Sequence, residues 1–528
     1  MKNNDFNIEL EDNDYKFMGK IDPSNPNTIP KFVDNINKPK VLRPKCVNSK
    51  GFYYEVEMKE CYHNFHKYFP KTSVWAYEGT VPGPTIEALR NQKIYVKWIN
   101  SLPLKHFLPI DRTIHGAVDN PEVRTVVHVH GARVSASSDG HPEAWFTKCY
   151  AITGIKFERE IYKYTNDQQA ATLWYHDHAM GITRLNVYAG LAGFYIINDT
   201  LEKILDIPSG HYDIPLMIQD KSFNSDGSLF YPDSPPFPVP VKPSITPFFL
   251  GNTIVVNGKV WPHLKVEPRK YRFRIVNGCN TRNLVLGLSN NQSFSQIGTD
   301  GGLLNTPVTL NEIPLEPAER AEIVIDFSKL RGQSLILKNL DDDSPNTGVV
   351  MEFKVDLPLL SEDTSKVPEI LYPIEEHLEE SLATMERDLT LSATRDEYGR
   401  PMLLLDNRMW HDPTTEKPIM DSIEVWNLVN LTNGAHPIHV HLVQFKILDR
   451  RFFDERKYLE EGKLEFIGEP MPPHEYERGW KDTVKAEPRM VTRIIMHFRE
   501  YPGDYVWHCH ILEHEDHDMM RPMRVLEN

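Results

Sequence analysis

One short segment recurs along the chain and sets the strongest limit on its fold. Alternating hydrophobic runs that end in Asn occur as IYVKWIN at 94–100, YRFRIVN at 271–277 and IEVWNLVN at 423–430. A period of two with many Val, Ile, Tyr and Trp residues is typical of β-strands. The three copies predict three related β-domains of the antiparallel sandwich type, rather than βαβ units.

The length agrees with this interpretation. A chain of 528 residues exceeds what one hydrophobic core supports, and domains of about 100–200 residues give about three. Charged and proline-rich stretches suggest a first domain at 1–198, a second at 207–357, a linker at 358–388 and a third domain at 389–528. We expect part of the linker, IEEHLEESLATMERD, to be helical, and residues 1–40 to form a surface arm or a disordered lead.

Composition excludes several classes of protein. The net charge of −15 argues against a nucleic-acid partner, because phosphate binding needs clustered Lys and Arg. No stretch approaches the roughly 18 apolar residues of a membrane span. The polar, acidic start MKNNDFNIELEDNDYKF predicts neither a signal peptide nor a membrane anchor. The five scattered cysteines imply neither a disulfide framework nor a thiolate zinc site, and leave pairing open: Cys46, Cys61, Cys149, Cys279 and Cys509.

Histidines gather in a way that surface residues do not. Of 22 histidines, ten fall in four short clusters: His128 and His130; His176 and His178; His436, His439 and His441; His508, His510 and His514. One His-X-His pair in a strand is often only two imidazoles on one face. Four clusters in one chain favour metal binding, although imidazole suits copper, zinc, iron and nickel alike.

A cysteine among these histidines selects the metal. Cys509, His514 and Met519 follow one another at spacings of five, and His436 lies earlier in the chain. Two imidazoles, a thiolate and a weak thioether describe an electron-transfer copper site, although a buried inert Cys and a core Met are the ordinary alternatives. Because neighbouring side chains on a strand point to opposite faces, Cys509 can ligate one copper while His508 and His510 reach two others.

The clusters resemble the four signatures of the multicopper oxidases, present here as HVHG (128–131), HDH (176–178), HPIHVH (436–441) and HCHILEHEDHDM (508–519). Longer stretches, among them LWYHDHAM, RLNVYAGL, NGKVWP and DEYGRPMLLLDN, are similar to the bacterial spore-coat laccases, relatives of bilirubin oxidase. The resemblance implies an all-β fold of three cupredoxin-like domains, which are Greek-key β-sandwiches or barrels, and four copper ions.

The resemblance also implies a role for each residue. The type 1 copper would take His436, Cys509, His514 and axial Met519; the type 2 copper would take His128 and His439; one type 3 copper would take His130, His176 and His510, and the other His178, His441 and His508. The middle domain would be a spacer that helps to wall the substrate cleft. Glu515 and Asp139 would deliver protons or tune the three-copper centre, unless they are solvated acids or orient ligand imidazoles.

The implied activity is that of a laccase, a benzenediol:oxygen oxidoreductase. Phenolic or aromatic donors would lose single electrons at the type 1 copper, and dioxygen would become water at the other three. A bilirubin oxidase, a metallo-oxidase for Mn, Fe or Cu(I), and a mainly structural spore-coat component remain alternatives. Location in the spore coat, contact with other coat proteins and a monomeric state are further expectations. The chain departs from relatives at two places. Asn433-Gly434-Ala435 stands where relatives often have an Arg and a Thr, and Asp341-Asp342-Asp343 lacks a cysteine that some relatives have.

Overall fold

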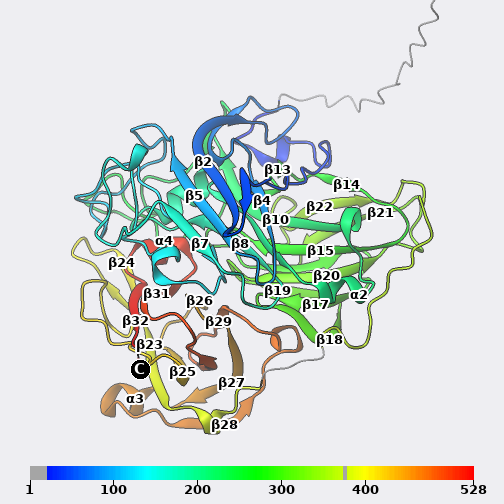
Figure 1. Ribbon diagram of the computed structural model, residues 1–528. Coiled ribbons are helices and arrows are strands. Elements are labelled where there is room, and N and C mark those ends of the chain that lie inside the picture. Colours follow the sequence, from blue (N-terminus) through cyan, green and yellow to red (C-terminus); the bar gives the residue numbers. More distant parts are fainter. Residues whose placement is uncertain (1–20, 373–376, 528) are drawn as a thin grey trace, which may run out of the picture.

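The computed structural model describes residues 21–372 and 377–527, and strands dominate it (Figure 1). The described strands form six sheets, which pair as three successive sandwiches. The all-β prediction is therefore confirmed.

The first sandwich covers the first third of the chain. One sheet has the order β1 (Cys46–Asn48), β2 (Gly51–His63), β5 (Ile94–Asn100), β7 (Ile161–Tyr164), with β3 (Thr72–Tyr77) on β2. The other has the order β4 (Gly83–Leu89), β9 (Ala192–Asn198), β8 (Ala171–Asp177), β6 (Val127–His130). Short helices in this part are η1 (Pro26–Thr28), η2 (Ala136–Ser138), η3 (Lys148–Tyr150) and α1 (Thr183–Ala189).

The second sandwich follows α2 (Thr200–Ile204) and η4 (Gly210–Tyr212). Its larger sheet has the order β13 (Lys259–Val260), β12 (Thr253–Val256), β10 (Asp213–Phe223), β15 (Lys270–Asn277), β20 (Arg320–Asp326), β17 (Phe294–Thr299), β18 (Gly302–Leu310), with β11 (Leu229–Phe230) on β10. Its smaller sheet has the order β14 (His263–Lys265), β22 (Val349–Lys354), β21 (Ser334–Asn339), β16 (Leu284–Leu288), β19 (Glu312–Leu315).

The third sandwich completes the chain. One sheet has the order β24 (Pro401–Leu405), β23 (Met385–Arg395), β25 (Ile423–Asn430), β30 (Val491–His497), β27 (Phe445–Phe453), β28 (Phe466–Met471). The other has the order β29 (Thr483–Ala486), β26 (His436–Val440), β31 (Gly503–Cys509), β32 (Met520–Val525). Its helices are η5 (Glu380–Leu382), α3 (Glu455–Glu461), η6 (Glu475–Glu477) and α4 (Leu512–Asp516).

The recurring segment forms the equivalent strand of each sandwich, β5, β15 and β25. Each lies between one parallel and one antiparallel neighbour. The terminal residues Asn100, Asn277 and Asn430 are buried, and each side-chain oxygen accepts from the backbone N–H two residues later. An Asx turn that ends a buried strand therefore explains why Asn recurs.

The first two sandwiches share a hydrophobic core, and the third has its own. One hydrophobic cluster runs continuously through the first two sandwiches, whereas a separate cluster fills the third. Figure 1 shows the third sandwich, in yellow to red, below the other two. The third sandwich contacts the other two through buried ion pairs and through a small apolar cluster that contains Met180 and Trp410.

Two expectations about the connecting segments can be compared with the structure. Phe32 and Ile36 donate backbone hydrogen bonds to Trp261 and His263, so 21–40 lies as an arm on the second sandwich, while 1–20 is outside the described residues. The segment 374–388, which was expected to be partly helical, is described from residue 377 and contains one short 3-10 helix before a strand. The helix is η5, and the strand, β23, begins at Met385, before the residue where the third domain was expected to start.

Strand pairing explains the difference. The side chains of Glu386 and Asp388 accept from the Asn427 amide on neighbouring β25, so pairing outweighs the helix propensity of an acidic run. No helix within the described parts of the chain has the length and apolar character to cross a lipid bilayer.

Candidate metal centres

Strand pairing places the histidines of distant motifs opposite one another. In the first sandwich, His128 on β6 faces His176 on β8. In the third, His439 on β26 faces His508 on β31. The two pairs lie against each other, because the ring of His128 is 5.7 Å from that of His439.

Five groups of possible metal ligands result, and within each group the ligand atoms lie within 4.8 Å of one another. Four of them contain only predicted ligands: His130, His176 and His510; His178, His441 and His508; His128, His439 and His441; and His436, Cys509 and His514. The fifth is His130, His439 and Asp482. All of these residues are buried. The structure thus gathers every predicted imidazole and thiolate ligand into one of two places, a large histidine cluster and a smaller site around Cys509.

The alternation of β31 separates these two places. His508 and His510 join groups that face the first sandwich, whereas Cys509 between them joins His436 and His514. Neighbouring side chains on a strand point to opposite faces, so the tripeptide bridges the two sites through a few covalent bonds.

Several imidazoles in the large cluster have one nitrogen held by a hydrogen bond and the other left without one, whereas both ring nitrogens of His510 lack a hydrogen-bond partner among the described residues. His128 and His439 hydrogen-bond through Nδ1 to the carbonyls of Asp139 and Asp482, at 2.6 and 2.7 Å. The Nε2 atoms of both rings are buried and have no hydrogen-bond partner among the described residues. Buried polar groups are seldom left unpaired, and an outer hydrogen bond that fixes a ring is the usual arrangement of metal-bound histidine. The residues therefore fit metal ions.

Burial also sets the protonation state that ligands need. It lowers the pKa of His176 and His178 to about 3 and that of His436 and His508 to about 4. These imidazoles are consequently neutral near pH 7, with a lone pair available for a cation.

The smaller site contains two imidazoles and a thiol. Cys509 Sγ lies 3.8 Å from His436 Nδ1 and 3.7 Å from His514 Nδ1. The Thr432 hydroxyl lies 2.8 Å from His436 Nε2 and fixes that ring. Met519 is fully buried in the same core cluster, and its carbonyl accepts from the Cys509 N–H. This donor set suits copper better than zinc, whose structural sites usually have four strong ligands.

The two predicted carboxylates lie beside the large cluster. Asp139 Oδ2 accepts from His441 Nδ1 at 2.7 Å. The carboxylate of Glu515 lies 3.2 Å from His508 Nδ1 and 3.5 Å from His178 Nδ1. Both acids are buried, and burial raises the pKa of Asp139 and that of Glu515, the latter to about 6. They are not solvated surface acids.

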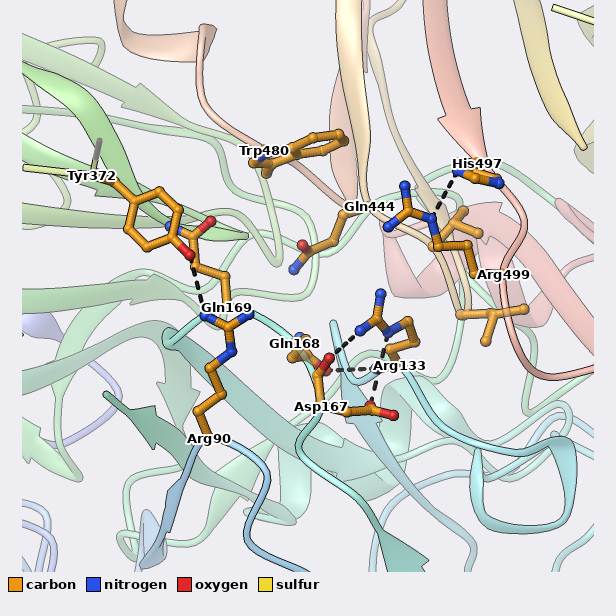
Figure 2. Close-up of a pocket in the computed structure, with 12 residues that line it drawn as sticks. Arg90, Arg133, Asp167, Gln168, Gln169, Tyr372, Gln444, Trp480, His497 and Arg499 are labelled. Carbon is orange, nitrogen blue, oxygen red and sulfur yellow. Dashed lines mark hydrogen bonds and ion pairs between the residues drawn. The ribbon is translucent and has the colours of Figure 1, made fainter. Parts of the chain in front are cut away.

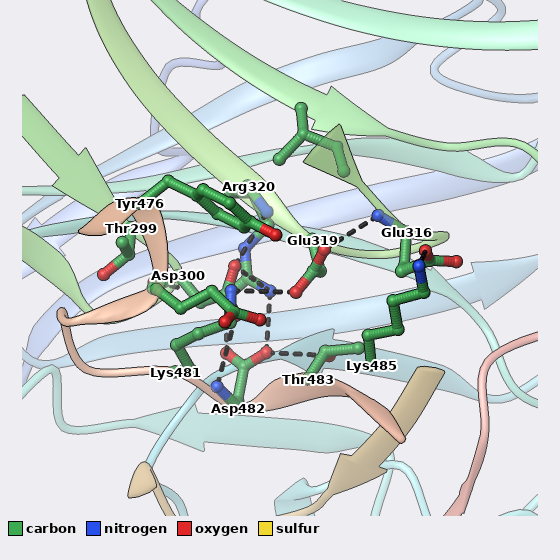
Figure 3. Close-up of polar contacts among 12 residues, drawn as sticks. Thr299, Asp300, Glu316, Glu319, Arg320, Tyr476, Lys481, Asp482, Thr483 and Lys485 are labelled. Carbon is green, nitrogen blue, oxygen red and sulfur yellow. Dashed lines mark hydrogen bonds and ion pairs between the residues drawn. The ribbon is translucent and has the colours of Figure 1, made fainter. Parts of the chain in front are cut away.

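A third carboxylate, Asp482, was missed by the sequence analysis. Its Oδ1 lies 3.0 Å from His130 Nε2, and its carbonyl holds His439, so one residue orients two rings of the cluster. Arg320, on β20 of the second sandwich, pairs with the same carboxylate, and Figure 3 shows the two side chains meeting. The domain predicted to be a spacer therefore reaches the residues that orient the histidines.

Further buried ion pairs join the second and third sandwiches next to Arg320 and Asp482. Lys481 lies 2.9 Å from Asp300 and 3.0 Å from Glu319, and Asp300 accepts the backbone N–H of Arg320 (Figure 3). No local sequence pattern indicated these residues. Two charged residues that precede a strand usually predict a solvated turn, and only the fold shows that they are buried.

The glycine of HVHG has a specific steric reason. Gly131 has φ +87°, and a Cβ atom there would lie 2.6 Å from Asp482 and 2.8 Å from Arg320. Only glycine accepts this conformation freely and leaves room for the charge pair.

The residues around His514 differ in burial and in their partners. Glu513 is buried and accepts from Tyr231, Asn280 and Thr281. Asp516 is buried against Arg184. By contrast, Phe248 contacts the His514 ring edge to face at 4.9 Å and is 54% exposed. His514 therefore lies next to an exposed aromatic side chain. The carboxylates of Glu513 and Asp516 are both engaged by other residues.

The remaining cysteines take no part in these sites. All five cysteines are free thiols, and only Cys279 and Cys509 are buried. The acidic loop at 341–343 is partly neutralised, because Asp342 pairs with Arg282. Asp341 accepts a hydrogen bond from the uncharged Asn283 amide.

Comparison with known proteins adds independent findings. Residues 57–122, 117–202 and 383–528 match family models described as multicopper oxidase. The chain is 53% identical to a laccase of Bacillus subtilis over 512 residues, 95% of this chain and 99% of the relative. It is 53% identical to a laccase of Bacillus stratosphericus, with 94% and 100% covered. A crystal structure of laccase from Pediococcus acidilactici superposes with a TM-score of 0.76 at 27% identity and covers 94% of this chain and 95% of that one.

Proposed function

This chain belongs to the multicopper oxidase family and is a laccase-type oxidoreductase that uses four copper ions, and we propose how its residues divide the work. The type 1 ligands are His436, Cys509, His514 and Met519; the type 2 ligands are His128 and His439; the type 3 ligands are His130, His176 and His510, and His178, His441 and His508. The ligands come from the proposed domains at 1–198 and 389–528, and none comes from 207–357. The grouping of buried imidazoles around Cys509 and across the sandwich interface carries this proposal.

We assign the path of electron transfer through the protein to strand β31. Bound copper supplies the one-electron steps by which four electrons from donor molecules reduce dioxygen to two waters. Cys509 would hold the copper that accepts electrons from the donor. Its peptide links to His508 and His510 would give the electrons a short path to the histidine cluster. Cys509 is fully buried, which keeps this path away from solvent, and its sulfur accepts a hydrogen bond from the Ile511 N–H at 3.5 Å.

Proton supply is the proposed task of Glu515 and Asp139. Reduction of dioxygen to two waters consumes four protons, so acids are needed next to the histidine cluster. Glu515 lies between His178 and His508, and Asp139 lies behind His441. Their positions support delivery by Glu515, and support orientation of His441 as a second task for Asp139.

The proposed donor is a phenol or another small aromatic molecule. Exposed Phe248 beside His514 offers an aromatic face next to a type 1 ligand, where a planar donor can stack. A metal-ion donor would need a free carboxylate there, but Glu513 and Asp516 are engaged in buried hydrogen bonds and an ion pair. This contrast favours aromatic donors over Mn, Fe or Cu(I).

A spectroscopic experiment tests the ligand assignment. Copper-loaded protein should bind four copper ions per chain and show intense blue absorption from the thiolate site. Cys509→Ser should lose the blue colour and one copper while it keeps the type 2 EPR signal, and Cys279→Ser, a buried cysteine elsewhere, should keep all of them. Retention of the blue colour in Cys509→Ser would contradict the assignment.

The place of action is a separate proposal. Resemblance of the sequence to spore-coat laccases supports location in the spore coat as a monomer in contact with other coat proteins. Spores that carry Cys509→Ser should then contain the protein in the coat but lack coat oxidase activity. An altered coat architecture in these spores would favour the enzyme role, whereas an unchanged architecture without copper chemistry would favour the structural role.

A further inference from the structure

The polar cavity of about 230 Å³ between the first and third sandwiches has partners for its charged side chains (Figure 2). Arg133 pairs with the Asp167 carboxylate and donates to the Asp167 carbonyl, and the Arg499 Nε–H donates to His497 Nδ1 at 2.8 Å. These charges are therefore satisfied within the protein. A buried hydroxyl beside the proposed type 1 ligands differs, because its hydrogen bonds select one of two states of a ligand.

This hydroxyl belongs to Thr432, in the turn between β25 and β26, and β26 begins at the proposed ligand His436. Thr432 is buried, and its Oγ1 atom has four polar neighbours: Asn430 Oδ1 at 2.8 Å, the Gly434 carbonyl at 3.0 Å, the Gly434 N–H at 3.3 Å and His436 Nε2 at 2.8 Å. A hydroxyl donates one hydrogen and accepts with two lone pairs. The identity of each neighbour therefore decides where the hydrogen goes.

The Asn430 amide has a defined orientation. Its Nδ2 atom donates to the carbonyls of Gly434 and Ala486, at 2.9 and 3.0 Å, and its Oδ1 atom accepts the Thr432 N–H at 2.9 Å. A flipped amide would place its NH₂ group against that N–H and its oxygen against two carbonyls. Oδ1 is therefore the atom that faces the Thr432 hydroxyl, and an amide oxygen only accepts.

These partners determine which nitrogen of the neutral His436 ring carries the proton. Asn430 Oδ1 and the Gly434 carbonyl both only accept, so the Thr432 hydrogen satisfies one of them. The His436 Nε2–H group then donates to the hydroxyl oxygen. With the hydroxyl donating to Nε2 instead, both oxygen contacts, at 2.8 and 3.0 Å, would lack a hydrogen. The network thus favours the Nε2–H tautomer, whose lone pair lies on Nδ1, 3.8 Å from Cys509 Sγ.

The other two sandwiches show that the turn itself does not need this hydroxyl. Asn100 and Asn277 end the equivalent strands β5 and β15, and they accept the backbone N–H of Leu102 and Cys279 in the same Asx turn. The position of Thr432 is thus a leucine in the first sandwich and a cysteine in the second. Of the three sandwiches, only the one with the proposed type 1 site has a hydroxyl at this position.

We propose that Thr432, oriented by Asn430, is a positioning residue that holds His436 as the Nε2–H tautomer and keeps Nδ1 free for the type 1 copper. The inference rests on the proposed assignment of His436 as a type 1 ligand. A hydrogen bond to the outer nitrogen of a ligand histidine fixes its ring and raises its basicity, and its loss weakens metal binding roughly 10–100-fold. The Asn that recurs at the strand ends thereby has a second task in the third sandwich.

NMR of the full-length, copper-free protein with nitrogen-labelled histidine tests the tautomer without any need for oxidase activity. The signals of His436 are identified by their absence in His436→Gln. Near neutral pH, the wild-type ring should show a protonated Nε2 and an unprotonated Nδ1. Thr432→Val keeps the shape but removes the hydroxyl, and should show a mixture of both tautomers, whereas Thr432→Ser should restore the wild-type pattern. Thr492→Val is the matched control, since this buried threonine of β30 has no hydrogen-bond partner for its hydroxyl among the described residues.

The copper-loaded protein gives a second readout. Competition with a chelator, followed by the blue absorption, measures the Kd of the type 1 copper. Thr432→Val should raise this Kd about tenfold or more, while Thr432→Ser and Thr492→Val should stay close to wild type. An unchanged Kd in Thr432→Val would overturn the link between the tautomer and copper binding.

Two NMR results would overturn the role of Thr432 itself. One is a wild-type His436 ring with its proton on Nδ1, a result that needs no variant and therefore does not depend on how a substitution folds. The other is an unchanged tautomer in Thr432→Val. A Thr432-dependent Nε2–H tautomer in a protein that binds no blue copper would support this role and refute the type 1 assignment, so the two proposals can fail separately.

Discussion

Replacement of Arg320 tests whether the middle domain contributes to the oxidase centre. The guanidinium group is fully buried, pairs with Asp482, and also donates to the carbonyls of Thr172, Ala318 and Asp300. Arg320→Met removes this cation but leaves the carboxylate of Asp482 buried. Breaking a buried ion pair in this way costs about 3–5 kcal/mol. Arg320→Lys keeps the charge but loses the fork geometry, and should cost about 1–3 kcal/mol.

Urea unfolding of the copper-free protein measures the loss of stability. Circular dichroism and tryptophan fluorescence should be recorded together, because a chain of three sandwiches need not unfold in one step. Type 2 EPR and the copper count of the loaded protein then report on the centre itself. Arg320→Met should lower the unfolding midpoint and broaden or alter the type 2 signal, since Asp482 would no longer hold His130 and His439 in place.

A double variant separates these two effects. Arg320→Met combined with Asp482→Leu removes both charges, and replacement of a whole buried pair by apolar groups is often neutral for stability. Stability should therefore recover in the double variant, while a lowered copper count should persist because His130, a proposed type 3 ligand, still lacks its carboxylate. A wild-type midpoint together with an unchanged EPR signal in Arg320→Met would refute the argument that the middle domain positions the ligands.

Three other outcomes are expected. Met519→Leu should raise the type 1 reduction potential measured by redox titration, since it removes a weak axial thioether; a lower potential would contradict that ligand. Gly131→Ala should destabilise the protein by more than the roughly 1–2 kcal/mol of a left-handed residue alone, because its Cβ would strike Asp482; Gly332→Ala, at φ +78° in open space, is the matched control for urea unfolding. Against the opposing effect of burial, hydrogen bonds from Arg524 and Lys156 lower the pKa of Asp504 to about 2, below its ordinary 3.8. Its contribution to stability is therefore complete above pH 3.8 and is lost as the pH falls toward 2, and Asp504→Asn should flatten acid unfolding in that window.

The ligand groups could be predicted from the sequence because they depend on short-range geometry. A His-Cys-His run on a strand has its faces fixed by the pleat, so the division between Cys509 and its neighbours follows from alternation. The recurrence of a strand that ends in Asn predicted three sandwiches for a similar local reason, namely the turn that Asn100, Asn277 and Asn430 each close.

Features that depend on contacts between distant parts of the chain could not be predicted from the sequence. Arg320 and Asp482 are 162 residues apart, and nothing near either one marks a buried pair. The acidic run before residue 389 favours a helix locally, but the pairing of β23 with β25 decides its structure. The directions of Glu513 and Asp516 likewise became known only from their partners, Tyr231 and Arg184.

The split of the large histidine cluster between the first and third sandwiches has a consequence for biosynthesis. His128 and His176 leave the ribosome long before His508 and His510, which lie near the C-terminal end of the chain. The first two sandwiches share a core and can fold during translation, yet they hold only half of the cluster. A nascent chain is therefore unable to assemble a complete centre before the third sandwich has been made and has docked onto the first. Oxygen chemistry at the centre is thus withheld until both parts are in place.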